Sequence, residues 1–259
     1  MGTALIQGAS RGIGLQFCST LAARGVTVIA CCRNPSSAHH LKDLQSQHPG
    51  LVDIVQLDVT KETDIIEASQ HVKTTHKKLD LLLNASGILS PTGKGETSLR
   101  DLTFQRFQET FAVNTFGPVM MAKHFNQILM AGGGMIGGKV TDPKQQHTSV
   151  FVNMSARVGS ISDNRAGGWY SYRMSKAALN MATKNLSIEL GRGKKKVVCI
   201  ALHPGTVDTE LSRPYHRNVP PGNLFSRQQC VDYLMAIIDR ATFADTGKYF
   251  GWDGAEIPF

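Results

Sequence analysis

The sequence predicts an α/β fold, in which one doubly wound parallel sheet of about seven strands carries helices on both faces. Short apolar runs alternate with longer helical patterns along the 259 residues, as is typical of strand–helix–strand units in a parallel sheet. A glycine-rich turn joins the first expected strand to the first expected helix, and no internal repeat or linker divides the chain. We therefore expect one domain that covers residues 1–259, an ordinary size for this class.

The individual elements follow from local patterns. Ala4–Ile6 is a short apolar run and Val26–Cys32 is apolar and β-branched, so both are expected to lie in buried strands. Leu15–Ala23 has a helical pattern that ends at Arg24-Gly25. By the same reasoning we expect strands near 3–7, 26–32, 53–57, 79–84, 150–154, 197–203 and 248–252, with helices between them that include 102–131 and 171–191.

Two segments interrupt this alternation. Residues 132–147 are rich in glycine and polar side chains. Because they follow a helix rather than a strand, we interpret them as a mobile surface insertion and not as a phosphate loop. Residues 210–228 contain three prolines and form the one long irregular stretch. Long loops of this kind are often lids or binding loops.

Charge and hydropathy exclude two kinds of partner. The net charge of +8 raises the question of nucleic acid. The basic residues are scattered, however, except in Arg192–Lys196, which follows an expected helix end where cations are favoured. We therefore expect no nucleic-acid partner. No run approaches the ~20 apolar residues of a membrane span, so we also expect no membrane contact.

The cysteines and histidines indicate a cytoplasmic protein without a metal. There are five cysteines, and the neighbours Cys31 and Cys32 should point to opposite faces of a strand. We expect buried thiols in a reducing compartment. The first strand begins almost at Met1, which leaves no room for a signal peptide before the fold. No spacing suggests a metal site, and His39-His40 is interpreted as a surface pair.

The turn after the first strand predicts a nucleotide site. Gly8, Gly12 and Gly14 permit a tight turn and close approach of a pyrophosphate, while the N-terminus of the following helix faces the anion. The spacing is Gly-x-x-x-Gly-x-Gly, not the Gly-x-Gly-x-x-Gly of the longer dehydrogenase fingerprint. The position between a strand and a helix favours a nucleotide over a plain loop.

Tyr172 and Lys176 form a candidate acid–base pair. Positions four apart share one face of a helix, so the ammonium is expected to favour the phenolate and lower the tyrosine pKa. Such a tyrosine can transfer protons near neutral pH. The pair alone is weak evidence, because many helices carry Tyr and Lys four apart on a solvated face.

Further motifs occur in order along nearly the whole chain, and with them the chain resembles the short-chain dehydrogenase/reductase family. The matching segments are the Gly8 turn, Leu57-Asp58-Val59, Asn84-Ala85-Ser86-Gly87, Val113-Asn114-Thr115, the set Ser155, Tyr172 and Lys176, and Pro204–Thr209. The closing stretch Gly247–Phe259 is similar to the end of the sniffer-like and C-factor-like carbonyl reductases.

This resemblance implies a Rossmann-type fold and a role for each catalytic residue. Tyr172 would protonate the carbonyl oxygen, Lys176 would lower the tyrosine pKa and hold the nicotinamide ribose, Ser155 would bind the reacting oxygen, and Asn114 would line a proton relay to Lys176. The implied cofactor-binding residues are Gly8, Ser10, Arg11, Gly12, Ile13, Gly14, Arg33, Asp58, Val59, Asn84, Ala85, Ser86, Gly87, Tyr172, Lys176, Pro204, Gly205, Val207 and Thr209.

The chain also departs from the family pattern. The gap between Ser155 and Tyr172 is longer than usual, so we expect Asp163–Trp169 to bulge outward and to shape the pocket. Ala85 replaces the family's second asparagine, which removes a structural hydrogen bond. Tyr170 is set aside as a catalytic candidate because residue 174 is methionine. Ser160 and Ser162 are set aside because Ser155 is the serine that ends an apolar strand.

The second strand ends in a way that favours NADP over NAD. Cys32 stands where NAD-preferring members usually present a carboxylate that binds the ribose 2′-hydroxyl. Arg33 follows it and Arg11 lies in the glycine turn, so two guanidinium groups are expected near a 2′-phosphate. The alternative is that Arg33 only terminates a strand.

We therefore expect an NADPH-dependent reductase of a small-molecule carbonyl: an aldehyde, ketone or quinone. Two alternatives stay open: an NAD-dependent alcohol or steroid dehydrogenase, and a nucleotide-binding regulator without turnover. Family members often dimerise through the helices that correspond to 102–131 and 171–191, so a homodimer is possible.

Overall fold

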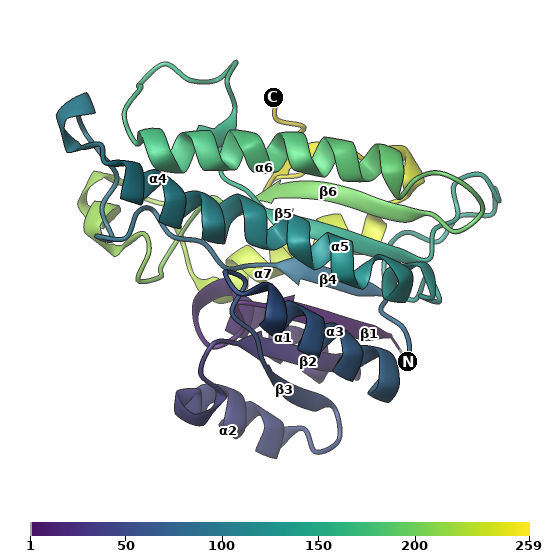
Figure 1. The fold of residues 1–259 in the computed structure, drawn as a ribbon. Coiled ribbons are helices and arrows are strands. Elements are labelled where there is room, and N and C mark those ends of the chain that lie inside the picture. Colours follow the sequence, from purple (N-terminus) through teal and green to yellow (C-terminus); the bar gives the residue numbers. More distant parts are fainter. Residues whose placement is uncertain (1) are drawn as a thin grey trace.

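The computed structural model describes residues 2–259 and confirms the α/β class. Seven parallel strands form one sheet in the order β3-β2-β1-β4-β5-β6-β9 (Figure 1). Their bounds are β1 Thr3–Gln7, β2 Thr27–Cys32, β3 Val52–Gln56, β4 Leu81–Asn84, β5 Ser149–Met154, β6 Val197–His203 and β9 Tyr249–Gly251. A separate two-stranded ribbon pairs β7 Thr206–Val207 with β8 Leu224–Phe225.

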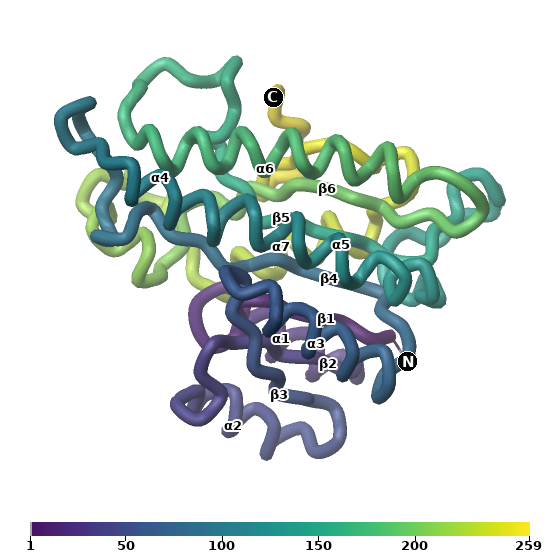
Figure 2. The backbone as a smooth tube through the Cα atoms, viewed as in Figure 1, coloured from purple at the N-terminus to yellow at the C-terminus, as the bar shows by residue number. Residues whose placement is uncertain are grey.

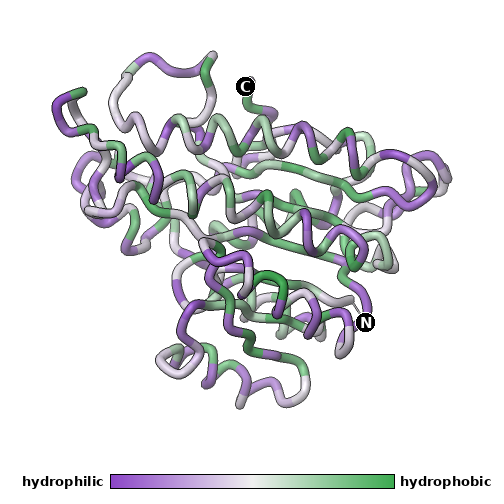
Figure 3. Tube along the Cα trace, viewed as in Figure 1, coloured by the Kyte–Doolittle hydropathy of each residue, from purple (hydrophilic) through white to green (hydrophobic). Residues whose placement is uncertain are grey.

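Helices cover both faces of the sheet and bury two apolar cores. Their bounds are α1 Gly12–Ala23, α2 His39–Gln47, α3 Glu62–Thr75, α4 Phe104–Phe111, α5 Gly117–Met130, α6 Tyr170–Glu189 and α7 Arg227–Arg240. One core lies beneath α1, α2 and α7, and the other beneath α3 and α5. Figure 3 shows largely apolar strands and helices in which polar and apolar residues are mixed. Cys31 and Cys32 lie in different cores, as the alternation along a strand predicts.

The strand order reverses between β1 and β4, and this reversal positions the site. From β1 the chain winds outward to β3, then crosses to β4 and winds the other way to β9 (Figure 2). The loops that leave the carboxyl ends of β1 and β4 therefore diverge, and a ligand site is expected in the crevice between them. Gly8 and Ala85 follow these two strands directly.

The predicted helix over 102–131 is correct in place but is not one regular helix. It consists of α4 and α5, joined by a π-helical segment, Ala112–Phe116. Pro118 lies in the first turn of α5, where its missing N–H costs least. The π-helical segment is notable because such segments are frequent at functional sites, and it contains Asn114.

The two irregular segments have different surroundings. The start of 132–147 is held to the sheet, because the buried carboxylate of Asp80 accepts hydrogen bonds from the backbone N–H groups of Gly133 and Met135. The stretch 210–228 contains a 3₁₀ helix, Arg213–Asn218, and the strand β8. Within residues 2–259, no helix has both the length and the apolar character needed to span a bilayer.

Candidate active site

The glycine turn is built for close backbone contacts. Gly8 has φ of 84°, and a Cβ there would lie 2.7 Å from the backbone nitrogen of Ser86. A Cβ on Gly14 would overlap the carbonyl oxygen of Gly8. Arg11 makes no side-chain cap on α1, and the first turn of α1 holds no acidic residue. The helix N-terminus is thus well suited to bind a phosphate.

A cleft of about 1,110 Å³ runs along the carboxyl edge of the sheet from this turn. It brings together nearly all of the site residues expected from the sequence. Those that line it are Gly8, Ser10, Arg11, Gly12, Ile13, Gly14, Arg33, Asp58, Val59, Ala85, Ser86, Gly87, Ser155, Tyr172, Lys176, Pro204, Gly205, Val207 and Thr209. Asn84 and Asn114 are absent from the lining and lie behind it.

Ser155, Tyr172 and Lys176 meet in one part of the cleft and are almost fully buried. Ser155 directly follows β5, and its hydroxyl donates to Asn180 Oδ1 at 2.6 Å. Tyr172 and Lys176 share one face of α6. The Lys176 ammonium lies 5.7 Å from the centre of the Tyr172 ring and donates to the carbonyl of Met154 at 2.7 Å.

The expectation of a lowered tyrosine pKa is wrong for the protein's own groups. Burial raises the pKa of Tyr172 well above its usual value, and burial lowers the pKa of Lys176 to about 7. The lysine charge alone would lower the tyrosine pKa, but removing both groups from water disfavours both charges. The lysine charge is itself weakened by the same burial, so the phenol is favoured over the phenolate.

Asn114 is held by several hydrogen bonds from its place in the π-helical segment. Its Oδ1 accepts from the N–H of Ile88 at 2.9 Å, and its Nδ2 donates to the carbonyl of Ile88 at 2.8 Å and to Ser175 Oγ at 3.0 Å. A Cβ on Gly87 would lie 3.4 Å from Asn114 Oδ1 and 3.5 Å from Lys176 Nζ. The amide therefore lies next to Lys176 without a direct hydrogen bond to it.

Asn84 links strands behind the cleft. Its Nδ2 donates to Asn153 Oδ1 at 2.9 Å, which ties β4 to β5, and both side chains are buried. Two residues further on, the Ser86 hydroxyl donates to Gln7 Oε1 at 2.7 Å. These bonds fix the ends of β1, β4 and β5 relative to one another.

The two arginines differ at the cofactor end of the cleft. Arg11 pairs with Glu210 at 2.5 Å, and both side chains are largely exposed. Arg33 is exposed, and within residues 2–259 it makes no ion pair at 4 Å or less. Cys32 and His40 line the same part of the cleft. Of these two arginines, Arg33 is therefore the one whose charge has no carboxylate beside it.

An aromatic wall, formed by Trp169, Tyr172 and Tyr215, borders the catalytic residues. The Trp169 and Tyr215 ring centres are 4.7 Å apart, and those of Trp169 and Tyr172 are 6.2 Å apart. Trp169 has φ of 46°, and a Cβ on Gly95 would lie 2.5 Å from its indole. Residues 163–167 are exposed. The expected bulge is therefore confirmed, and only its last residue, Trp169, returns to the cleft.

Three buried polar groups that support this region were not expected from the sequence. Glu96 accepts from the Ser171 hydroxyl at 2.5 Å and from the Ser171 N–H at 3.3 Å, so it caps the start of α6 next to Tyr172. Asn180 accepts from Ser155 as described above. His203 lies in the cleft wall, and its buried Nδ1 has no hydrogen-bond partner within residues 2–259. A buried polar residue near a motif is visible only once tertiary contacts are known.

The rejected candidates lie elsewhere. Tyr170 is half-buried and is absent from the cleft lining. Ser160 and Ser162 donate instead to the backbone carbonyls of Pro258 and Phe259. The choice of Ser155 and Tyr172 over their neighbours thus agrees with the geometry.

Comparison with protein families gives a match over most of the chain. The family model described as short chain dehydrogenase matches residues 2–219. An uncharacterised oxidoreductase of Schizosaccharomyces pombe is 30% identical, over 98% of this chain and 96% of that protein. The C-signal protein of Myxococcus xanthus is 28% identical, over 70% of this chain and 93% of that protein.

Solved structures agree with these sequence relatives. The NADPH-bound carbonyl reductase from chicken fatty liver superposes with a TM-score of 0.84 at 28% identity, over 99% of this chain and 98% of that one. The carbonyl reductase Sniffer of Drosophila melanogaster also gives 0.84, at 26% identity and over the whole of both chains. The resemblance to sniffer-like and C-factor-like proteins is thereby confirmed.

Proposed function

This chain belongs to the short chain dehydrogenase family, and from that premise we propose that it is an NADPH-dependent carbonyl reductase whose residues 1–259 act as one NADP-binding domain. The observation that carries the proposal is the convergence of Ser155, Tyr172 and Lys176 in one buried part of a cleft that begins at an uncapped helix N-terminus.

The cleft fits a dinucleotide. The α1 N-terminus and the turn at Gly8 would hold the pyrophosphate, Arg33 the 2′-phosphate, and Asp58 and Val59 the adenine. Ala85–Gly87 and Pro204–Thr209 would lie against the nicotinamide half. When bound, the cofactor supplies the hydride. The absence of a carboxylate at the end of β2 and the unpaired charge of Arg33 support NADP over NAD.

The chain's own residues supply the proton and hold the reacting oxygen. Tyr172, kept protonated by its burial, donates its phenolic proton to the carbonyl oxygen. Ser155, in the same cleft, would hydrogen-bond that oxygen as negative charge develops, and its one hydroxyl proton would then turn from Asn180 Oδ1 to the substrate. Lys176 carries a proton at pH values below about 7, and its ammonium stabilises the phenolate that remains. Asn114, next to Lys176, lines the path by which the proton is replaced.

The walls of the site suggest the class of substrate. Leu89, Ala156 and Tyr172 form a small apolar cluster, against which Val158, Trp169 and Tyr215 pack. Such a surface suits a flat or apolar carbonyl compound, for which desolvation is favourable. We include aldehydes, ketones and quinones in the proposal, with aromatic members preferred.

Two properties of the whole protein complete the proposal. Met174, Met181 and Ile188 lie seven residues apart on α6 and are 49%, 63% and 52% exposed, and Phe104 on α4 is 78% exposed. This stripe supports a homodimer through α4 and α6, which sedimentation would test. All five cysteines are buried and free, which supports a cytoplasmic location, and cell fractionation would test it.

The decisive test is loss of NADPH absorbance over a panel of quinones, aldehydes, diketones and steroids. Wild type is expected to reduce at least one class. Tyr172→Phe is expected to lower the rate ~10²- to 10⁴-fold, since it removes the general acid, while NADPH binding persists. Tyr170→Phe is the matched control on the same helix and should retain activity. A near-normal rate for Tyr172→Phe contradicts the mechanism, and a wild type that binds NADPH without turnover favours the regulator alternative.

A further inference from the structure

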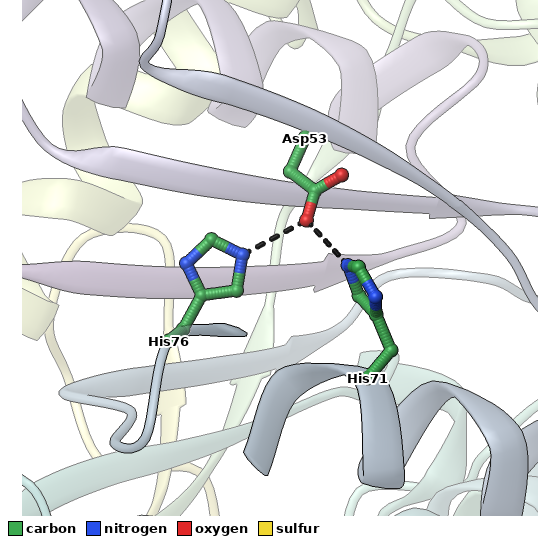
Figure 4. Close-up of side chains that lie close together, drawn as sticks. All are labelled: Asp53, His71 and His76. Carbon is green, nitrogen blue, oxygen red and sulfur yellow. Dashed lines mark hydrogen bonds and ion pairs between the residues drawn. The ribbon is translucent and has the colours of Figure 1, made fainter. Parts of the chain in front are cut away.

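Three side chains that take no part in the proposed reaction converge beside the edge strand of the sheet (Figure 4). Asp53 lies near the start of β3, His71 lies on α3, and His76 directly follows α3. All three are absent from the lining of the catalytic cleft, which lies at the opposite, carboxyl end of the strands. No metal site was expected from the sequence, because these residues share no recognisable spacing.

The potential ligand atoms face one another. Asp53 Oδ2 lies 2.7 Å from His71 Nε2 and 2.8 Å from His76 Nε2, and the ligand atoms all lie within 4.8 Å of one another. The two imidazole rings meet nearly edge to face, with centres 6.1 Å apart. Both imidazole nitrogens thus point at the same carboxylate oxygen (Figure 4).

The spacing of these ligand atoms can be compared with the spacing that a metal ion requires. Tetrahedral bonds of about 2.0–2.2 Å place neighbouring ligand atoms about 3.3 Å apart. The two N–O contacts would therefore have to open by ~0.6 Å, and the two imidazole nitrogens, which lie within 4.8 Å of each other, would have to approach the same spacing. Rotation of the side chains is the movement required.

The chemistry of the ligands selects the kind of ion. Two imidazoles and one carboxylate suit borderline divalent metals such as Zn²⁺, whereas Ca²⁺ and Mg²⁺ prefer oxygen ligands. His71 is 43% exposed and His76 13% exposed, so solvent reaches the site and a water can complete the coordination.

We propose that Asp53, His71 and His76 form a binding site for one divalent transition-metal ion of the Zn²⁺ type. The ion would join β3 to the C-terminal end of α3. Because β3 is an edge strand that pairs only with β2, such a cross-link stabilises the side of the sheet that ends at Asp58 and Val59 in the cleft. The role is structural, because the site lies outside the cleft.

Calorimetric titration with Zn²⁺ alone, on metal-free protein saturated with NADPH, tests the site. Wild type is expected to bind one equivalent with micromolar affinity or better. His71→Gln and His76→Gln should each weaken binding at least ~10-fold, because each removes one of three ligands. His124→Gln is the matched control, since His124 also contacts a carboxylate, Glu62, at 2.8 Å but has no second histidine there.

Thermal unfolding gives an independent measurement. Zn²⁺ is expected to raise the Tm of wild type and of His124→Gln, because a ligand bound only by the folded state stabilises that state. It should not raise the Tm of His71→Gln. That substitution is at an exposed position, so it should leave the metal-free fold and NADPH binding unchanged. The proposal is overturned if wild type takes up no Zn²⁺ at submillimolar concentrations, in which case the three side chains form a hydrogen-bonded cluster only. It is also overturned if both histidine variants bind as wild type does.

Discussion

Arg33→Ala is expected to reduce the preference for NADP over NAD. Arg33 is exposed at the cofactor end of the cleft and has no carboxylate within ion-pair distance in residues 2–259. A guanidinium meets a 2′-phosphate through charge-assisted hydrogen bonds, whose loss costs ~1.5–3 kcal/mol. This corresponds to a rise in the Kd for NADP of roughly 10- to 100-fold. The Kd for NAD should hardly change, because NAD lacks that phosphate.

Arg11 provides an internal comparison. Its guanidinium already pairs with Glu210 at 2.5 Å, so part of its charge is offset and Arg11→Ala should raise the Kd for NADP less than Arg33→Ala does. Cys32→Asp, at the end of β2, should shift the preference towards NAD by repelling the phosphate.

Fluorescence titration of each variant with both cofactors at one fixed salt concentration measures these effects, because phosphate contacts weaken as salt screens them. The reasoning fails if wild type binds NAD as tightly as NADP. It also fails if Arg33→Ala weakens binding of both cofactors equally, since the loss would then not concern the 2′-phosphate.

Three further predictions concern the substrate end of the cleft. Burial lowers the pKa of Lys176 to about 7, so between pH 7 and 10 the unfolded chain binds more protons than the folded chain. The unfolding free energy of wild type should therefore rise over this range by up to about 4 kcal/mol relative to Lys176→Met. Urea titrations at several pH values measure this difference. Asn180→Leu removes the acceptor that competes with the substrate oxygen for the Ser155 proton, so kcat should not fall and the Kd for NADPH should not change, as steady-state kinetics and titration would show. Trp169→Ala should raise KM for aromatic carbonyls more than for small aliphatic ones, and equal effects on both would contradict a stacking role.

The fold and most of the cleft lining could be predicted because their signals are local. An apolar run such as Ala4–Ile6 indicates a buried strand by itself, and the turn at Gly8 needs a few residues of context. β4 starts at Leu81, two residues later than expected, where it pairs with β1 and β5. The π-helical segment around Asn114 interrupts an otherwise helical pattern. Local patterns do not contain that information.

What sequence could not provide lies in contacts between distant residues. Trp169 and Tyr215 are 46 positions apart by residue number, yet their rings are in contact. Asn180 reaches Ser155 from another element. The lowered pKa expected for Tyr172 was wrong for the same reason, because the degree of burial of a side chain is a property of the folded chain.

The opposite pKa shifts of Tyr172 and Lys176 have one cause and one consequence. Burial disfavours charge on both, so the phenol keeps its proton at pH 7 and the lysine is near the midpoint of its titration. When Tyr172 gives its proton to a carbonyl oxygen, the new phenolate raises the proton affinity of the nearby amine, so the lysine gains a charge as the tyrosine does. The site then holds an ion pair instead of a lone buried anion. Reduction starts from the protonation state that the folded chain favours, whereas oxidation of an alcohol must first remove a proton that burial retains.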